Sequence, residues 1–133
     1  MAFSGNLVVN KAREYLGVRY YHCGHIRSGG LDCLGLVLCV FSDLGVVFPK
    51  IKKYGRAINS RNLLSQVDEH FTEVHGDPVP GDVLIMLFDD TPSHFAIYTG
   101  ETIIHSYERV GEVVEHRFSN SWKSKVFKVV RYV

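Results

Sequence analysis

A change of sequence pattern near Asp77 is the feature that most constrains the fold. Before it, apolar residues recur at helical spacing, whereas after it short apolar runs alternate with turns rich in Gly and Pro. The connections between the later runs are too short for crossovers, which favours antiparallel pairing. Helices followed by strands predict an α+β domain, with N-terminal helices packed on a small antiparallel sheet of about five strands.

The helical part of the chain carries start and stop signals for two helices. Ser4 can cap a first helix that stops at Gly17, and Asp32 can cap a second that stops at Gly45. Apolar residues cover most of the circumference of the second helix, so we expect it to be buried. A third helix is expected over Ser60–His70.

Five strands are expected in the second part of the chain: Val83–Phe88, His94–Thr99, Thr102–Tyr107, Val113–Arg117 and Val126–Val133.

Composition narrows the classes of protein that fit. The chain has 133 residues, 46% of them apolar and 22% charged, which predicts a single folded domain over residues 1–133. A formal charge of +1 argues against a nucleic-acid partner, and no apolar run is long enough for membrane insertion. The three cysteines are an odd number and no signal peptide is evident, which favours free thiols in a chain made in a reducing compartment such as the cytoplasm.

Cys33 stands where a reactive thiol would be placed. It follows a glycine-rich loop (residues 18–31) and Asp32, and it opens the second helix. Backbone N–H groups at a helix start stabilise a thiolate, lower its pKa and can bind a developing oxyanion. The alternative is a small buried apolar residue, which is the common role of an isolated cysteine.

The other two thiols have simpler interpretations. Cys39 lies among apolar residues of the same helix and is expected to fill the core. Cys23 could bind a metal together with His22 and His25, but no second pair at the spacing of a zinc site accompanies them. We therefore expect no metal and no cofactor.

A nucleophilic thiol needs a base and a group that orients the base. If Gly100 and Glu101 form a two-residue hairpin loop, His94 and His105 become diagonal neighbours on one face of the hairpin. The alternative is a structural pair of half-buried histidines. The remaining histidines, His22, His25, His70, His75 and His116, are expected in surface or loop roles.

Tyr20 precedes the loop that leads to Cys33. Its phenol could donate a hydrogen bond to an oxyanion or to substrate, or its ring could simply pack on the core.

Five segments together resemble the NlpC-type papain-like cell-wall peptidases. They begin with Leu16-Gly17-Val18-Arg19-Tyr20 and Gly30-Leu31-Asp32-Cys33-Leu34-Gly35-Leu36-Val37. Val79-Pro80-Gly81-Asp82-Val83-Leu84 follows, and then come Ser93-His94-Phe95-Ala96-Ile97-Tyr98 and Ile103-Ile104-His105-Ser106-Tyr107. The resemblance covers nearly the whole chain, and it is strongest to short versions from the tail-gene clusters of phages and gene transfer agents. These versions share the stretch Val114-Glu115-His116.

The resemblance implies a role for five residues. Cys33 matches the nucleophile, His94 the general base and His105 the residue that orients it. Tyr20 matches a tyrosine on the oxyanion or substrate side, and Asp32 an aspartate that helps hold the amino group of the substrate.

Two positions depart from the family pattern. Leu34 stands where many members have a serine associated with substrate recognition, and His22 replaces the usual tryptophan.

The resemblance also implies a function. Members cleave peptide bonds in peptidoglycan stem peptides, often between D-glutamate and a diamino acid. A phage-like tail would carry such a chain to the cell wall or periplasm, with a tail hub or tip protein as partner. The alternatives are a structural tail-tip module with little activity and a thiol acyltransferase on the same fold.

Overall fold

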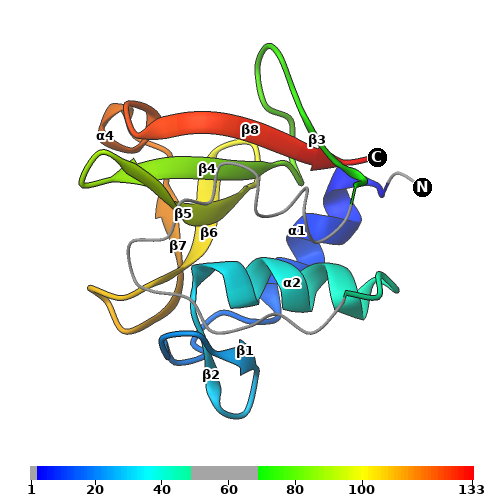
Figure 1. The fold of residues 1–133 in the computed structure, drawn as a ribbon, viewed down its shortest axis with the longest axis vertical. Helices are drawn as coiled ribbons and strands as arrows, with labels where there is room; N and C mark the ends of the chain where they lie inside the picture. Colours follow the sequence, from blue (N-terminus) through cyan, green and yellow to red (C-terminus); the bar gives the residue numbers. More distant parts are fainter. Residues whose placement is uncertain (1–2, 49–68) are drawn as a thin grey trace.

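The computed structural model describes residues 3–48 and 69–133 as a sheet with the two longer helices on one side (Figure 1). Its elements are α1 (Gly5–Arg13), β1 (His25–Ile26), β2 (Gly30–Leu31), α2 (Cys33–Asp43), β3 (Phe71–Glu73), β4 (Val83–Phe88), β5 (Thr91–Tyr98), β6 (Thr102–Tyr107), β7 (Glu112–Arg117), α4 (Asn120–Lys123) and β8 (Val126–Tyr132).

The main sheet is antiparallel and has six strands in the order β3-β8-β4-β5-β6-β7. The expected antiparallel α+β arrangement is therefore confirmed, with six strands where about five were expected. The additional strand is β3, which has only three residues and takes its place by pairing with β8. A strand this short leaves no periodic pattern in the sequence.

Both expected helix starts agree with the structure, with Ser4 and Asp32 at the N-cap positions of α1 and α2. The expected loop over residues 18–31 contains the small β1–β2 hairpin. Residues 60–68 of the expected third helix lie outside the described residues, and Glu69 and His70 form a turn.

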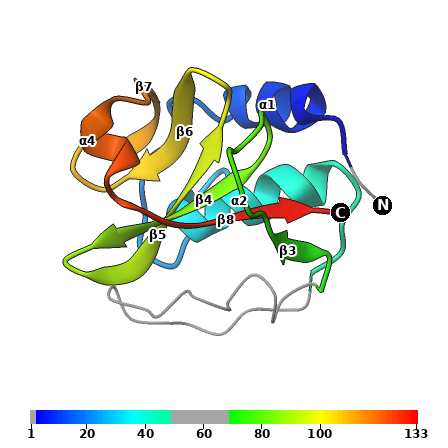
Figure 2. The same ribbon diagram turned by 90° about the horizontal axis from the view of Figure 1, so that it is seen from above.

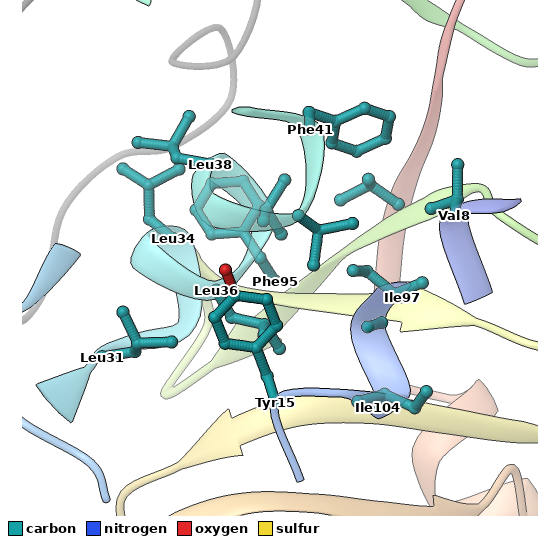
Figure 3. Packing of buried hydrophobic residues seen from close by; sticks show 14 of the residues in the cluster. Val8, Tyr15, Leu31, Leu34, Leu36, Leu38, Phe41, Phe95, Ile97 and Ile104 are labelled. Atoms are coloured by element: carbon teal, nitrogen blue, oxygen red, sulfur yellow. The ribbon is translucent and has the colours of Figure 1, made fainter. Parts of the chain in front are cut away.

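The core lies between α2 and the sheet. α2 packs against β5 and β6, and α1 packs on α2 (Figure 2). Figure 3 shows the side chains of Leu34, Leu36 and Phe41 from α2 gathered with Phe95 and Ile97 from β5. Because α2 is buried on most sides, its first residue is held firmly against β5.

All three cysteines are free thiols. Cys39 packs against the main core cluster, as expected, and burial together with the carboxylate of Asp43 raises its pKa to about 11. Among the described helices, none is long and apolar enough to cross a bilayer.

Candidate active site

The start of α2 is fixed by a cap and by a close backbone approach. The Asp32 side chain is buried, and its Oδ1 accepts a hydrogen bond from the Gly35 N–H at 2.6 Å. Its Oδ2 accepts another from the Cys23 N–H at 3.0 Å, which ties the preceding loop to the helix. A side chain at Gly35 would place its Cβ 1.9 Å from the carbonyl oxygen of Gly24, so only glycine fits there. These contacts hold Cys33 at the first helical position.

The Cys33 thiol keeps its proton in this environment. Burial and the neighbouring Asp32 carboxylate raise its pKa to about 12, although backbone N–H groups of Phe95, Leu34 and Cys33 itself act in the opposite direction. The thiol donates a weak hydrogen bond to the Ser93 carbonyl oxygen, with sulfur and oxygen 3.7 Å apart. The N–H groups of the helix start act in the expected direction, but desolvation outweighs them, so the net shift of the Cys33 pKa is upward.

His94 lies in β5, and its Nε2 is 2.7 Å from Nδ1 of His105 in β6. The hairpin register expected from a Gly100-Glu101 loop is confirmed, since Tyr98 pairs with Ile103. Burial and the neighbouring His105 hold the pKa of His94 well below its usual range. The Phe88 ring stacks on the His94 imidazole at 4.2 Å and 10°, which fixes the plane of the ring. The site therefore holds a neutral imidazole in a defined orientation.

His105 is fully buried and contacts a third histidine. Its Nε2 lies 3.0 Å from Nδ1 of His116 in β7, and burial together with His116 lowers the pKa of His105 to about 3. The expected surface or loop role of His116 is therefore wrong. The strand register of the β6–β7 hairpin would have predicted this contact. Val114 pairs with His105, and His116 lies two residues after Val114 on the same face of β7.

A cleft of about 750 Å³ is lined by four of the five candidate residues. Its walls include Tyr20, Asp32, Cys33 and His94, whereas His105 is buried behind His94. The lining residues that the sequence did not single out are Phe88, Asp89, Thr91, Ser93, Ser106, Tyr107, Glu108, Arg109, Ser121, Trp122 and Lys125. Most come from loops and strand ends that carry no local motif. The cleft mixes basic, acidic and aromatic side chains, which suits a peptide ligand.

Tyr20 reaches the cleft from the segment before β1. Its backbone N–H donates to the Gly111 carbonyl at 2.8 Å, and it forms an isolated bridge with Leu31. The buried Ser106 hydroxyl donates to the Leu31 carbonyl at 2.6 Å. These contacts thus connect both Tyr20 and strand β6 to Leu31, the residue before the Asp32 cap.

One group of side chains in the described parts of the chain could hold a metal ion. Donor atoms of His22, Cys23 and Asp32 lie within 4.8 Å of one another. The possible metal ligands considered from the sequence were His22, Cys23 and His25, with His25 in place of Asp32. Both Asp32 oxygens already accept backbone hydrogen bonds, so the carboxylate also has a structural role here.

Comparison with known proteins gives consistent matches. The model of the NlpC/P60 family matches residues 17–131. The chain is 26% identical over 133 residues to the gamma-DL-glutamyl hydrolase of Bacillus subtilis (strain 168), a match that covers 93% of this chain but only 29% of that protein. The chain therefore spans less than a third of the length of this relative.

Two solved structures have the same fold. An NlpC/P60 family protein from Bacillus cereus ATCC 10987 has a TM-score of 0.74 at 20% identity, covering 99% of this chain and 41% of that one. The NlpC/p60 domain of the peptidoglycan hydrolase SagA has a TM-score of 0.67 at 20% identity, covering 98% and 100%. These likenesses confirm the expected papain-like α+β fold.

Proposed function

Since the chain belongs to the NlpC/P60 family, we propose that it is a cysteine peptidase that hydrolyses peptide bonds in peptidoglycan stem peptides. The observation that carries the proposal is the 2.7 Å contact between His94 and His105, in a site whose cleft is lined by Cys33. A nucleophile, a base and a residue that orients the base are the minimum that acyl transfer by a thiol requires.

The proposed reaction begins with a neutral thiol and a neutral imidazole. Cys33 attacks the scissile carbonyl as His94 takes its proton, so that the ion pair forms during attack and not before it. The Cys33 N–H, with the Tyr20 phenol, stabilises the oxyanion. His94 then protonates the leaving amine, and water hydrolyses the acyl-enzyme.

The charged residues of the cleft support a stem-peptide substrate. Arg109 and Lys125 can pair with the carboxylates of such a peptide, and Asp32 with its amino group. The named activity of the Bacillus subtilis relative supports a bond next to a glutamyl residue. Leu34 is buried in the core, so no side-chain hydroxyl is present where many family members have a serine, and we expect a substrate choice that differs from theirs.

For delivery, we propose that a phage-like tail carries the chain to the cell wall, with a tail hub or tip protein as its partner. The support is the likeness of the sequence to short tail-cluster members, including the Val114–His116 stretch. Co-purification of the chain with tail particles, followed by mass spectrometry, tests this part separately from catalysis.

The deciding experiment is a digest of purified peptidoglycan by the wild type and by Cys33→Ala, with mass spectrometry of the fragments. We expect new stem-peptide fragments with the wild type and none with the variant. Binding without cleavage by both proteins would favour a structural tail-tip module. Transfer of the acyl group to an added amine without hydrolysis would favour an acyltransferase. Cys39→Ala is the matched control, because Cys39 packs against the core and does not line the cleft.

A further inference from the structure

We propose that His116 is a positioning residue: it accepts a hydrogen bond from His105 and thereby fixes the tautomer in which His105 can orient His94. This inference rests on the proposed function, because it assigns a partner to the residue that orients the base. It extends the site by one residue, to a row of three histidines on β5, β6 and β7.

Two contacts define this row. His94 Nε2 lies 2.7 Å from His105 Nδ1, and His105 Nε2 lies 3.0 Å from His116 Nδ1. The rings meet nearly edge to face, at 71° for the first pair and 77° for the second. His105 therefore presents one ring nitrogen to His94 and the other to His116, as a chain of hydrogen bonds requires.

The chemistry of imidazole gives the row a direction. A neutral imidazole carries its proton on one nitrogen and accepts on the other. If His94 is to take the Cys33 proton, the nitrogen left for it is Nδ1, because Nε2 faces His105. Nε2 of His94 then carries a proton and donates to Nδ1 of His105. His105 must in turn carry its own proton on Nε2.

The proton on Nε2 of His105 needs a hydrogen-bond acceptor, and Nδ1 of His116 is that acceptor. His105 has no exposed surface, so an Nε2–H without a partner would be buried and unsatisfied. The other tautomer of His105 would point an N–H at the N–H of His94 and break the contact that orients the base. Nδ1 of His116 removes this conflict by making the productive tautomer the favoured one.

His116 is itself held in place. It lies in β7 opposite Ile103, and its ring stacks on Trp122 with centroids 5.7 Å apart and 22° between the planes. The Tyr107 ring meets it edge to face at 5.9 Å. The sheet register and these two aromatic rings fix the direction of the imidazole, so its Nδ1 stays aimed at His105.

Two variants of His116 separate an acceptor role from a packing role. His116→Phe keeps a ring against Trp122 but has no acceptor. His116→Asn loses the ring but places an amide oxygen near the position of Nδ1. If the acceptor matters, we expect kcat on peptidoglycan to fall about 5- to 10-fold in His116→Phe and to stay within about 2-fold in His116→Asn. A packing role alone predicts the reverse order.

A spectroscopic readout keeps this test independent of hydrolysis. In protein labelled with ¹⁵N-histidine, the ring nitrogen shifts report which nitrogen carries the proton. We expect the Nε2–H tautomer at His105 in the wild type and in His116→Asn, and its loss in His116→Phe. An Nδ1–H tautomer at His105 in the wild type would overturn the proposal without any variant. So would an unchanged His105 spectrum in folded His116→Phe. If peptidoglycan is not cleaved at all, the proposed function fails while the tautomer measurement still decides the role of His116.

Discussion

The two sides of the cleft are built by different kinds of interaction. On the side of the nucleophile, Asp32 caps the helix through Gly35, three residues away. On the side of the base, residues eleven positions apart meet across strands, His94 with His105 and His105 with His116. The position of the nucleophile thus depends on a hydrogen bond within a short segment, whereas the position of the base depends on the register of three strands. Substitutions on the two sides should therefore fail in different ways.

Loss of the base should have the largest effect. We expect His94→Ala to lower kcat on peptidoglycan by about 10³-fold or more, because His94 is the group proposed to take the Cys33 proton. Release of new amino groups from peptidoglycan measures the rate. His75→Ala is the control, since His75 is exposed and does not line the cleft. Activity within tenfold of the wild type would remove His94 from the mechanism.

Loss of the orienting residue should cost less. We expect His105→Ala to lower kcat about 10²-fold and to leave a measurable rate, because His94 remains beside the cleft but loses its hydrogen bond. His105→Asn should recover part of the loss, since its amide oxygen can accept from His94 as asparagine does in papain-like triads. Equal rates for the two variants would show that the hydrogen bond is not what His105 provides.

The histidine side should also make the fold sensitive to acid. The pKa of His105 is about 3 in the folded chain, so below its ordinary value of 6.5 the unfolded chain binds a proton that the folded chain does not. Stability should therefore decrease as the pH falls from 6.5 toward 3. For His105 alone we expect a loss of about 2 kcal/mol between pH 6.5 and 5.

Urea unfolding at the two pH values measures this loss. His105→Asn should show a shallower dependence on pH, since asparagine does not titrate. A slope equal to that of the wild type would mean that His105 is not the group responsible.

The nucleophile side should respond mainly in stability. We expect Asp32→Ala to lower the free energy of unfolding by about 1–2 kcal/mol, because Gly35 and Cys23 lose their hydrogen-bond acceptor. Asp32→Asn should retain only part of this stability, because its one amide oxygen can still cap Gly35 but its NH2 group cannot accept the hydrogen bond from Cys23. Thermal or urea unfolding compares the two variants, and an equal loss in both would mean that the charge, not the cap, matters.

The smallest expected effect is that of a chelator. In the proposed reaction the nucleophile and the base are both side chains of the protein, so EDTA should leave the rate on peptidoglycan unchanged. His22→Ala tests the nearby group of possible metal ligands in the same assay. A clear loss of activity with EDTA in the wild type, but not in His22→Ala, would contradict the metal-free mechanism.

The sequence predicted the parts of the fold whose signals are local. Asp32 and Gly45 marked both ends of α2, and the Gly100-Glu101 turn set the register that places His94 beside His105. The same reasoning missed β3, which is too short to carry a pattern of its own. It also missed His116, because no register was worked out for the β6–β7 hairpin, where Val114 faces His105.

Phe88 and Trp122 were missed for a related reason. Phe88 ends β4, and its ring reaches His94 because β4 and β5 are neighbours in the sheet. Trp122 lies in the short helix α4, and it meets His105 edge to face at 5.0 Å. Neither position carries a motif, since each ring contacts the site through the packing of separate elements.

The sequence by itself determined the class of fold, the thiol at a helix start and the pairing of two histidines, because caps, turns and strand periodicity act over a few residues. Only the tertiary structure decided the protonation of the site. Desolvation favours the neutral forms of Cys33 and His94, and at Cys33 it outweighs the helix N–H groups, whose effect was expected from the sequence. Burial depends on every element packed around a group, and no local stretch of sequence contains that information.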